Sequence, residues 1–136
     1  MRFVEEVVVE AVLPTVRSML AAELRDREYT QREIADLLGI SQSAVSKYVH
    51  GNVGRNERVA DDEQVRDLVE RLAAGFDSGD IAPVEALIEM EVCLRDLEQG
   101  GLVAELHAEA VPGLTVEAAT AIHDEGGRPR ETARVR

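Results

Sequence analysis

The stretch TQREIADLLGISQSAVSKYV, residues 30–49, contains two short apolar patterns separated by one glycine. Thr30, followed three residues later by Glu33, has the form of a capping box, which marks the first turn of a helix. Gly39 predicts the end of that helix, because glycine enters the left-handed conformation without steric cost. Ser41 then offers an N-cap for a second helix. The stretch therefore predicts two helices joined by a turn of about three residues.

Two short helices joined by a tight, glycine-containing turn form the helix-turn-helix, a motif that reads the major groove of DNA. Ala35 is small where the two helices must cross closely. Apolar residues stand where the pair would pack on itself and on the preceding helix, namely at Ile34, Leu38, Ile40, Val45 and Tyr48. The alternative is that the pair is one more element of a helical bundle. The two caps, the small residue and the non-acidic face of the second helix favour the DNA-binding motif.

The outward side of the second helix, at about 41–50, contains no carboxylate, although the chain has 27 Asp and Glu residues. Amide and hydroxyl groups can hydrogen-bond base edges, and a lysine can contact guanine or a phosphate. The predicted base-reading residues are Ser41, Gln42, Ser43, Ser46, Lys47 and His50. Contacts to the DNA backbone are predicted for Gln31, at the start of the first helix, and for Arg55 and Arg58 after the second.

Together with the preceding VLPTVRSMLAAELRDREY, residues 12–29, the stretch resembles the Cro/λ-repressor (xenobiotic-response-element) class of helix-turn-helix. Over residues 4–52 the chain is similar to small archaeal predicted transcriptional regulators of that class. The resemblance implies an all-α, λ-repressor-like DNA-binding domain and says little about the target or an effector. The family has several cysteines near the match to residues 92–107, where this chain has only Cys93. A cysteine metal site is therefore not expected.

The composition is strongly acidic and almost free of lysine. The 136 residues include fourteen Arg and a single lysine against eighteen Glu and nine Asp, for a net charge of -12. Haloarchaeal proteins have this composition, since short carboxylates hold water and cations well; an acidic mesophilic protein is the alternative. One cysteine excludes an internal disulfide, and neither a signal peptide nor a membrane span is visible. We therefore expect a soluble cytoplasmic protein that does not bind membranes.

Most of the excess negative charge lies in the part of the sequence that comes after the predicted helix-turn-helix. Residues 31–60 have four basic and three acidic groups, whereas residues 61–110 have three basic and fourteen acidic groups. An acidic chain is repelled by nucleic acid at low salt. At about 1 M salt, however, the Debye length is only about 3 Å, so distant carboxylates would barely act on the DNA. The acidity is thus compatible with DNA binding in a salty cytoplasm.

The rest of the chain is predicted to be helical. Residues 3–12 are ambiguous between helix and strand, with helix favoured, and Pro14 suits the first turn of a helix that presents Val16, Leu20 and Leu24 on one face. Further helices are expected from 61–63 onward and at 83–99, 102–109 and 115–123, with a polar linker at 51–62 and a break at 75–80. The expected organisation is a helix-turn-helix domain over 1–58, an acidic helical extension over 59–123 and a disordered tail over 124–136.

No other cluster indicates catalysis, so we expect neither an enzyme nor a cofactor. Cys93, His107 and His123 match no zinc spacing, and Cys93 is predicted to be a small core residue. The carboxylates of the helix at 83–99 fall on its polar side. The tail arginines are predicted to be a solvated end rather than an arm along DNA, and they are Arg128, Arg130, Arg134 and Arg136.

We expect a homodimer, because one recognition helix covers only a few base pairs and two-fold symmetry requires half-sites about 34–36 Å apart. The segment 80–99 has a wide apolar surface and is the predicted dimer seam, with residues 4–12 second. The rival hypothesis is an interaction protein, coactivator-like or an antitoxin. There the helix-turn-helix would be a folding unit, and the acidic segment 61–110 would bind a partner.

Overall fold

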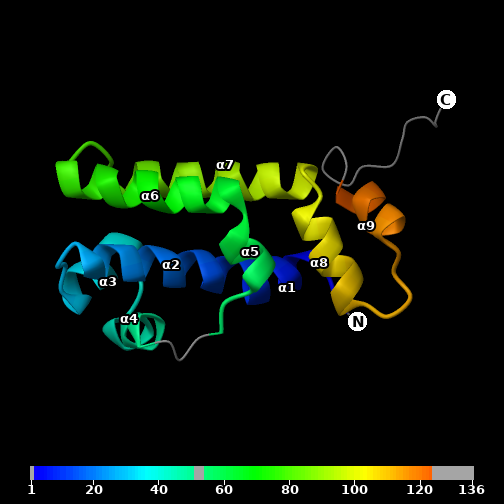
Figure 1. Cartoon of the computed structure of the whole chain (residues 1–136), viewed down its shortest axis with the longest axis horizontal. Coiled ribbons are helices and arrows are strands. Elements are labelled where there is room, and N and C mark those ends of the chain that lie inside the picture. Colours follow the sequence, from blue (N-terminus) through cyan, green and yellow to red (C-terminus); the bar gives the residue numbers. More distant parts are fainter. Residues whose placement is uncertain (1, 51–53, 124–136) are drawn as a thin grey trace. The chain divides into compact units, whose positions relative to one another are not determined.

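The computed structural model describes residues 2–50 and 54–123, and every regular element in these ranges is a helix (Figure 1). The helices are α1 (Val4–Val7), the π-helix η1 (Val8–Val12), α2 (Leu13–Asp26), α3 (Gln31–Leu38), α4 (Gln42–Val49), α5 (Glu57–Asp61), α6 (Glu63–Ser78), α7 (Pro83–Gln99), α8 (Leu102–Ala110) and α9 (Val116–His123). The predicted all-α class is confirmed. The predictions for the tail, including its four arginines, lie outside the described residues.

The contacts divide the chain into two units, each of which is considered by itself. One unit is Val9–Cys93, and the other combines Met1–Val8 with Leu94–Arg136. This division differs from the boundary predicted at residue 58. The physical reason is that α5 and α6 both pack on α2, which also carries α4 and α3. The helix-turn-helix therefore shares one core with the first half of the acidic segment.

Helix α2 is the centre of the unit Val9–Cys93 (Figure 1). Val16, Leu20 and Leu24 recur every four residues, and all three are buried, as the sequence predicted. Each surrounding helix supplies at least one side chain that is fully buried, namely Ile34 from α3, Val45 from α4, Val59 from α5 and Leu72 from α6. The core of this unit is thus built from aliphatic side chains around one central helix.

Pro14 lies in the first turn of α2, as the sequence predicted. The chain is already helical from Val4, and Pro14 is the second residue of α2. A proline inside an α-helix lacks the N–H donor, and its ring collides with the carbonyl four residues earlier. The turn before Pro14 is the wider π-helix η1, whose hydrogen-bond spacing moves that carbonyl away. The helical prediction for residues 3–12 is confirmed, so helical structure precedes α2 without a break.

The segment before α6 contains a helix where the sequence predicted only a polar linker. Asn56 caps α5, since its Oδ1 accepts a hydrogen bond from Val59 N at 3.2 Å. The backbone N of Asn56 donates to Thr15 Oγ1 on α2 at 2.8 Å, and Val59 is buried. A helix of five residues has too little periodicity to be found in the sequence. It exists because α2 supplies a buried hydroxyl and a core for it.

Helix α6 continues into the break predicted at 75–80 and ends at Ser78, followed by Gly79 with a φ of 82°. Gly75 lies inside the helix and is buried. A Cβ at Gly75 would collide with the side chain of Ile81, and Ile81 N donates to Gly75 O at 3.1 Å. Gly75 is therefore needed for the chain to turn back toward α7, and it does not interrupt α6. On the two helices, Arg71 and Glu89 form an ion pair at 2.7 Å.

The second unit is built around α8, which contacts α1 and α9. Val103, Ala104 and Leu106 of α8 are buried, as is Val7 of α1. The imidazole of His107 is also buried, and its Nε2 donates to the backbone carbonyl of Arg2 at 3.0 Å. The helices predicted at 102–109 and 115–123 are confirmed as α8 and α9.

Candidate nucleic-acid interface

The ends of α3 and α4 are fixed by the side chains that the sequence singled out. Thr30 Oγ1 accepts from Glu33 N at 3.1 Å, and Glu33 Oε1 accepts from Thr30 N at 2.8 Å, which completes the capping box. Gly39 follows α3 in the left-handed conformation with a φ of 67°. Ser41 Oγ then accepts from Ala44 N at 3.1 Å and caps α4. All three predicted signals are confirmed.

The two helices pack on each other and on α2 through their apolar sides (Figure 1). Ile34, Ala35 and Val45 are buried, whereas the other three apolar residues of the motif, Leu38, Ile40 and Tyr48, are half-buried. The small side chain of Ala35 lies where the pair crosses closely, and Ala35 O accepts from Ile40 N at 3.1 Å in the turn. This packing leaves the opposite side of α4 exposed.

The outward side of α4 carries all six predicted base-reading residues. Ser41, Gln42, Ser43, Lys47 and His50 are exposed, and Ser46 is half-buried. Residues 42, 43, 46, 47 and 50 share one side of a helix, because three or four residues make one turn. The sequence of α4, QSAVSKYV, contains no Asp or Glu. This surface can donate and accept hydrogen bonds, and it has one positive charge and no negative charge.

Some hydroxyls of this face already have partners within the motif. Ser41 Oγ caps α4 and lies 3.2 Å from Ser43 Oγ. Ser46 Oγ lies 3.1 Å from His50 Nδ1. These contacts orient the short side chains without using all their donors and acceptors. By contrast, Gln42 and Lys47 are exposed and make no hydrogen bond or ion pair within the described ranges.

The start of α3 adds an arginine that the sequence reasoning missed. A shallow depression at this point is lined by Arg25, Glu28, Tyr29, Thr30 and Gln31. Gln31, a predicted backbone contact, is half-buried there, and Arg25 is exposed. The guanidinium of Arg25 has no ion pair or hydrogen bond in the described part of the chain. The available signal was a basic residue in the last turn of the helix that precedes the motif.

Arg27 and Tyr29, in the turn between α2 and α3, both contact Asp77 of α6, and we call these three residues the Asp77 clamp. Arg27 Nη1 lies 3.1 Å from Asp77 Oδ2, and the Tyr29 hydroxyl donates to Asp77 Oδ1 at 3.3 Å. Partial burial, together with the Asp77 carboxylate, raises the pKa of Tyr29 above its ordinary value of 10.0. Because Asp77 lies near the end of α6, these contacts connect the turn before α3 to α6.

Arg55 and Arg58, predicted to hold the DNA backbone, lie after α4 and are both exposed. Arg55 Nε donates to Ser18 Oγ at 3.0 Å and Nη2 to Ser18 O at 3.2 Å. A guanidinium has five N–H donors, so this anchoring on α2 leaves others for an anion. Arg58 is on α5. The structure thus fixes the position of Arg55, and the phosphate contacts themselves stay predictions.

Other kinds of site have little support in the described residues. Within 2–50 and 54–123, no group of three or more His, Cys, Asp or Glu side chains is placed to hold a metal ion. Cys93 is buried, as predicted for a small core residue, and His107 is buried in the other unit. His123 is the last residue of α9. Among these described helices, none is sufficiently long and apolar to cross a membrane.

Residues 20–60 match the family model described as helix-turn-helix, of the xenobiotic-response-element type. The match begins inside α2, includes α3 and α4 entirely and ends within α5, so it coincides with the geometry described above. Neither a search of curated proteins nor a search of solved structures gave a match. The family is one of DNA-binding domains, and residues 20–60 of this chain form a DNA-binding helix-turn-helix in a λ-repressor-like all-α fold.

Proposed function

We propose that the protein is a sequence-specific transcriptional regulator whose helix α4 lies in the major groove of DNA. The observation that carries this proposal is the exposed side of α4, which presents amide, hydroxyl and ammonium groups and no carboxylate. Gln42 reads adenine through its amide, and Lys47 contacts guanine or a phosphate. The serines and His50 supply further donors and acceptors at the base edges.

The DNA backbone is held at both ends of the motif. Gln31 and Arg25 contact a phosphate beside the start of α3, where the helix dipole also favours an anion. Arg55 and Arg58 contact the backbone after α4. Such contacts fix the register of the protein on the duplex, so that a few side chains on α4 can specify the sequence.

The regulator acts as a homodimer, and the outer face of α7 forms the seam. Val84, Leu87, Ile88 and Val92 are 54–69% exposed, although all four are large and apolar. They recur at helical spacing, so they make a continuous stripe that water would contact in a single copy. A two-fold dimer that reads DNA must place its two α4 helices on half-sites about 34–36 Å apart, and the proposed seam has to meet this requirement.

The test of DNA reading uses Gln42→Ala and Lys47→Ala, with Gln99→Ala and Arg66→Ala as controls at exposed positions on other helices. Genome-wide footprinting at native salt first identifies the sites that the parent occupies. We expect each α4 variant to lose roughly tenfold or more in affinity for those sites, because a base contact contributes about 1–3 kcal/mol. The controls keep parental occupancy. Equal occupancy by parent and α4 variants would contradict the proposal and favour the interaction-protein hypothesis.

The test of the dimer uses Ile88→Glu, which places a charge in the apolar stripe, and Ala74→Glu, which adds the same charge on an exposed position of α6. Sedimentation analysis is expected to show a dimer for the parent and for Ala74→Glu, and a monomer for Ile88→Glu. The monomeric variant should also bind a two-half-site operator more weakly, because one set of contacts is lost. If the parent protein stays monomeric at every concentration, the proposed dimer interface on α7 is wrong.

We also propose that the protein works in concentrated salt, as its haloarchaeal-like composition suggests. Fourteen carboxylates within 61–110 repel DNA at low salt, whereas at about 1 M salt their field extends only about 3 Å. Folding and DNA binding should therefore both persist in molar KCl. Unfolding curves measured from about 0.1 to 3 M KCl test this, and a stability that falls steadily with added salt would contradict it.

A further inference from the structure

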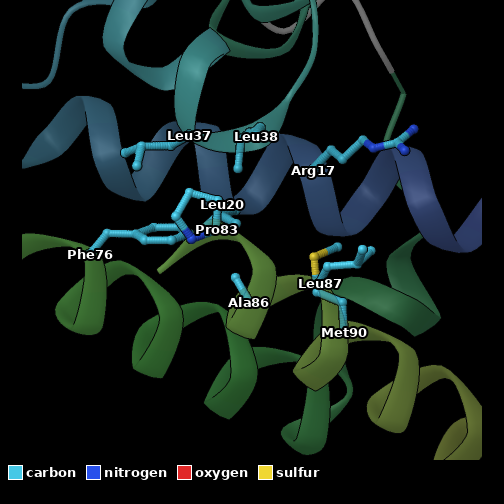
Figure 2. A pocket seen from close by; sticks show the side chains of 9 residues that line it. All are labelled: Arg17, Leu20, Leu37, Leu38, Phe76, Pro83, Ala86, Leu87 and Met90. Atoms are coloured by element: carbon cyan, nitrogen blue, oxygen red, sulfur yellow. The ribbon is translucent and has the colours of Figure 1, made fainter. Parts of the chain in front are cut away.

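The unit Val9–Cys93 contains an apolar cavity beside the helix-turn-helix (Figure 2). Its volume is about 110 Å³, and its walls come from α2, α3, α6 and the first turns of α7. Leu37 and Leu38 of α3 face Phe76, Ala86 and Met90 across the space (Figure 2). A cavity of about 150 Å³ with a similar lining in another protein binds benzene. The size therefore suits a phenyl ring or a short branched aliphatic chain.

One charged residue, Arg17, lies at the edge of the cavity. Its aliphatic stem forms part of the wall, and its guanidinium points away from the apolar side chains (Figure 2). Arg17 is half-buried, and it makes no hydrogen bond or ion pair with any residue in 2–50 or 54–123. None of the nine lining residues is acidic. A half-buried guanidinium with no partner in the described residues, at the edge of an apolar cavity, can pair with an external anion.

We propose that this cavity binds a small organic monocarboxylate that has one phenyl or branched aliphatic group. The apolar group fills the space between α3 and the α6–α7 hairpin, and the carboxylate pairs with Arg17 at the rim. The two parts of such a ligand match the two parts of the site. The proposal does not depend on DNA binding, although Leu37 and Leu38 make the ligand a neighbour of the helix-turn-helix.

The size of the cavity separates this occupant from larger ones. About 110 Å³ has no room for a helix or a peptide segment, and a free phosphate would leave the apolar walls without a partner. The remaining competitor is a single apolar side chain from a second copy of the chain, since Leu87 of the exposed α7 stripe also borders the space. That competitor predicts a different response to filling the cavity.

The experiment measures binding of phenylacetate and 3-methylbutanoate to the full chain by calorimetry and NMR, with the corresponding neutral amides as matched controls. We expect saturable binding of at least one acid, with a Kd on the order of 1 mM or tighter. The amides are expected to bind about tenfold more weakly, because the charge-assisted hydrogen bonds to Arg17 are lost. Failure of every probe to saturate would overturn the proposal.

Two variants locate the site. Ala86→Leu fills the cavity, so acid and amide should both lose binding while circular dichroism shows a folded chain. Arg17→Gln keeps the cavity and should reduce the preference for acid over amide from about tenfold to about twofold, whereas Arg66→Gln, at an exposed position on α6, should leave it unchanged. An unchanged preference in Arg17→Gln would overturn the proposal even if Ala86→Leu did not fold.

The competing hypothesis, in which a side chain of a second copy fills the cavity, predicts a different experimental result. If no probe binds the parent and Ala86→Leu converts a dimer into a monomer, the cavity receives a side chain of a second copy and the ligand proposal is wrong. Loss of acid binding in Ala86→Leu with an unchanged oligomeric state supports it. Because neither readout uses DNA, failure here leaves the proposed DNA-binding function untouched.

Discussion

The helical pair α3–α4 and the pair formed by α6 with the part of α7 up to Cys93 belong to the same unit, and they differ in how completely their apolar side chains are covered. In α3–α4, Ile34 and Val45 are fully buried, and the exposed side of α4 is polar. In α7, four large apolar side chains are more than half exposed, and Ile88 is 57% exposed. A single copy of the chain thus completes the core of α3–α4 and leaves α7 with an apolar surface for another molecule.

The glycines of the two pairs also serve different physical needs. Gly39 follows α3 with a φ of 67°, and a Cβ there would meet no atom within 4 Å. Gly75 lies within α6, where a Cβ would collide with Ile81. The first glycine is required by backbone conformation and the second by close packing. Gly39, in the turn into α4, is therefore open to substitution at some cost in strain, whereas Gly75 has no room for any side chain.

The sharpest test of the comparison substitutes the same residue type in each pair. Ile34→Ala should lower the free energy of unfolding by about 2–5 kcal/mol, because it leaves a cavity in a full core. Ile88→Ala should change the stability of the monomer by no more than about 0.5 kcal/mol, as an exposed substitution. Urea unfolding at several protein concentrations separates the monomer from any dimer. Equal losses in the two variants would mean that α7 is covered within one copy.

The second test concerns the packing at Gly75. Gly75→Ala should cost about 1–3 kcal/mol, because a methyl group there forces Ile81 out of its place. In an Ile81→Ala background the same change should cost much less, since the colliding atoms are gone. Thermal unfolding of the four proteins gives the coupling directly. Full cost in both backgrounds would show that Ile81 is not the neighbour responsible.

The third test uses the two left-handed residues that flank α3. Gly39→Ala should destabilise the chain by about 1 kcal/mol, because alanine is strained at this φ. Glu28 occupies a similar conformation, with a φ of 71°, so Glu28→Gly should be neutral or stabilising by up to about 1 kcal/mol. Urea unfolding should give the two changes opposite signs. A clear loss in Glu28→Gly would indicate that the glutamate side chain contributes more than its backbone costs.

The smallest effect is expected at the Asp77 clamp, which joins the two pairs. Because the side chains of Arg27 and Asp77 are 28% and 49% exposed, Asp77→Asn should cost no more than about 1 kcal/mol. The same change should lower the pKa of Tyr29, which burial and the Asp77 carboxylate raise. The contribution of Tyr29 is fully present below its unfolded pKa near 10, and it is lost as the pH rises through the higher folded pKa.

An absorbance titration in a Tyr48→Phe background reports on Tyr29 alone, because the chain has two tyrosines. Asp77→Asn should move the midpoint downward, and Asp80→Asn, at an exposed neighbour, should leave it in place. A midpoint that Asp77→Asn does not change would show that partial burial and the Glu33 carboxylate, and not Asp77, raise the pKa of Tyr29.

Local chemistry made the helix-turn-helix predictable from the sequence. Thr30, Glu33, Gly39 and Ser41 each perform a backbone task that only a few residue types can perform, so their order defines two helices and the turn. Once the two helices were defined, the spacing of polar residues along the second helix also predicted which side of α4 is polar. Helices α7, α8 and α9 were also predictable from the sequence, the long helix α7 from its apolar periodicity.

The elements that were predicted wrongly are those whose structure depends on tertiary contacts. Helix α5 depends on a hydroxyl of α2 that bonds Asn56, which lies 41 residues away in the sequence. Gly75 was interpreted as a break because glycine lowers helix propensity, but its role is set by Ile81 after the turn. For the same reason the cavity beside Arg17 was not found in the sequence, since four separate helices enclose it.

The bond between His107 and the carbonyl of Arg2 has a consequence for how the protein is made. Ribosomes emit residues 2–8 first and α8 about a hundred residues later, so at roughly 5–20 residues per second the opening segment waits on the order of ten seconds for its partner. Residues 9–93 form a compact unit of their own and can assemble in the meantime. Synthesis thus favours a middle-first order, in which the helix-turn-helix forms before the two remote segments find each other.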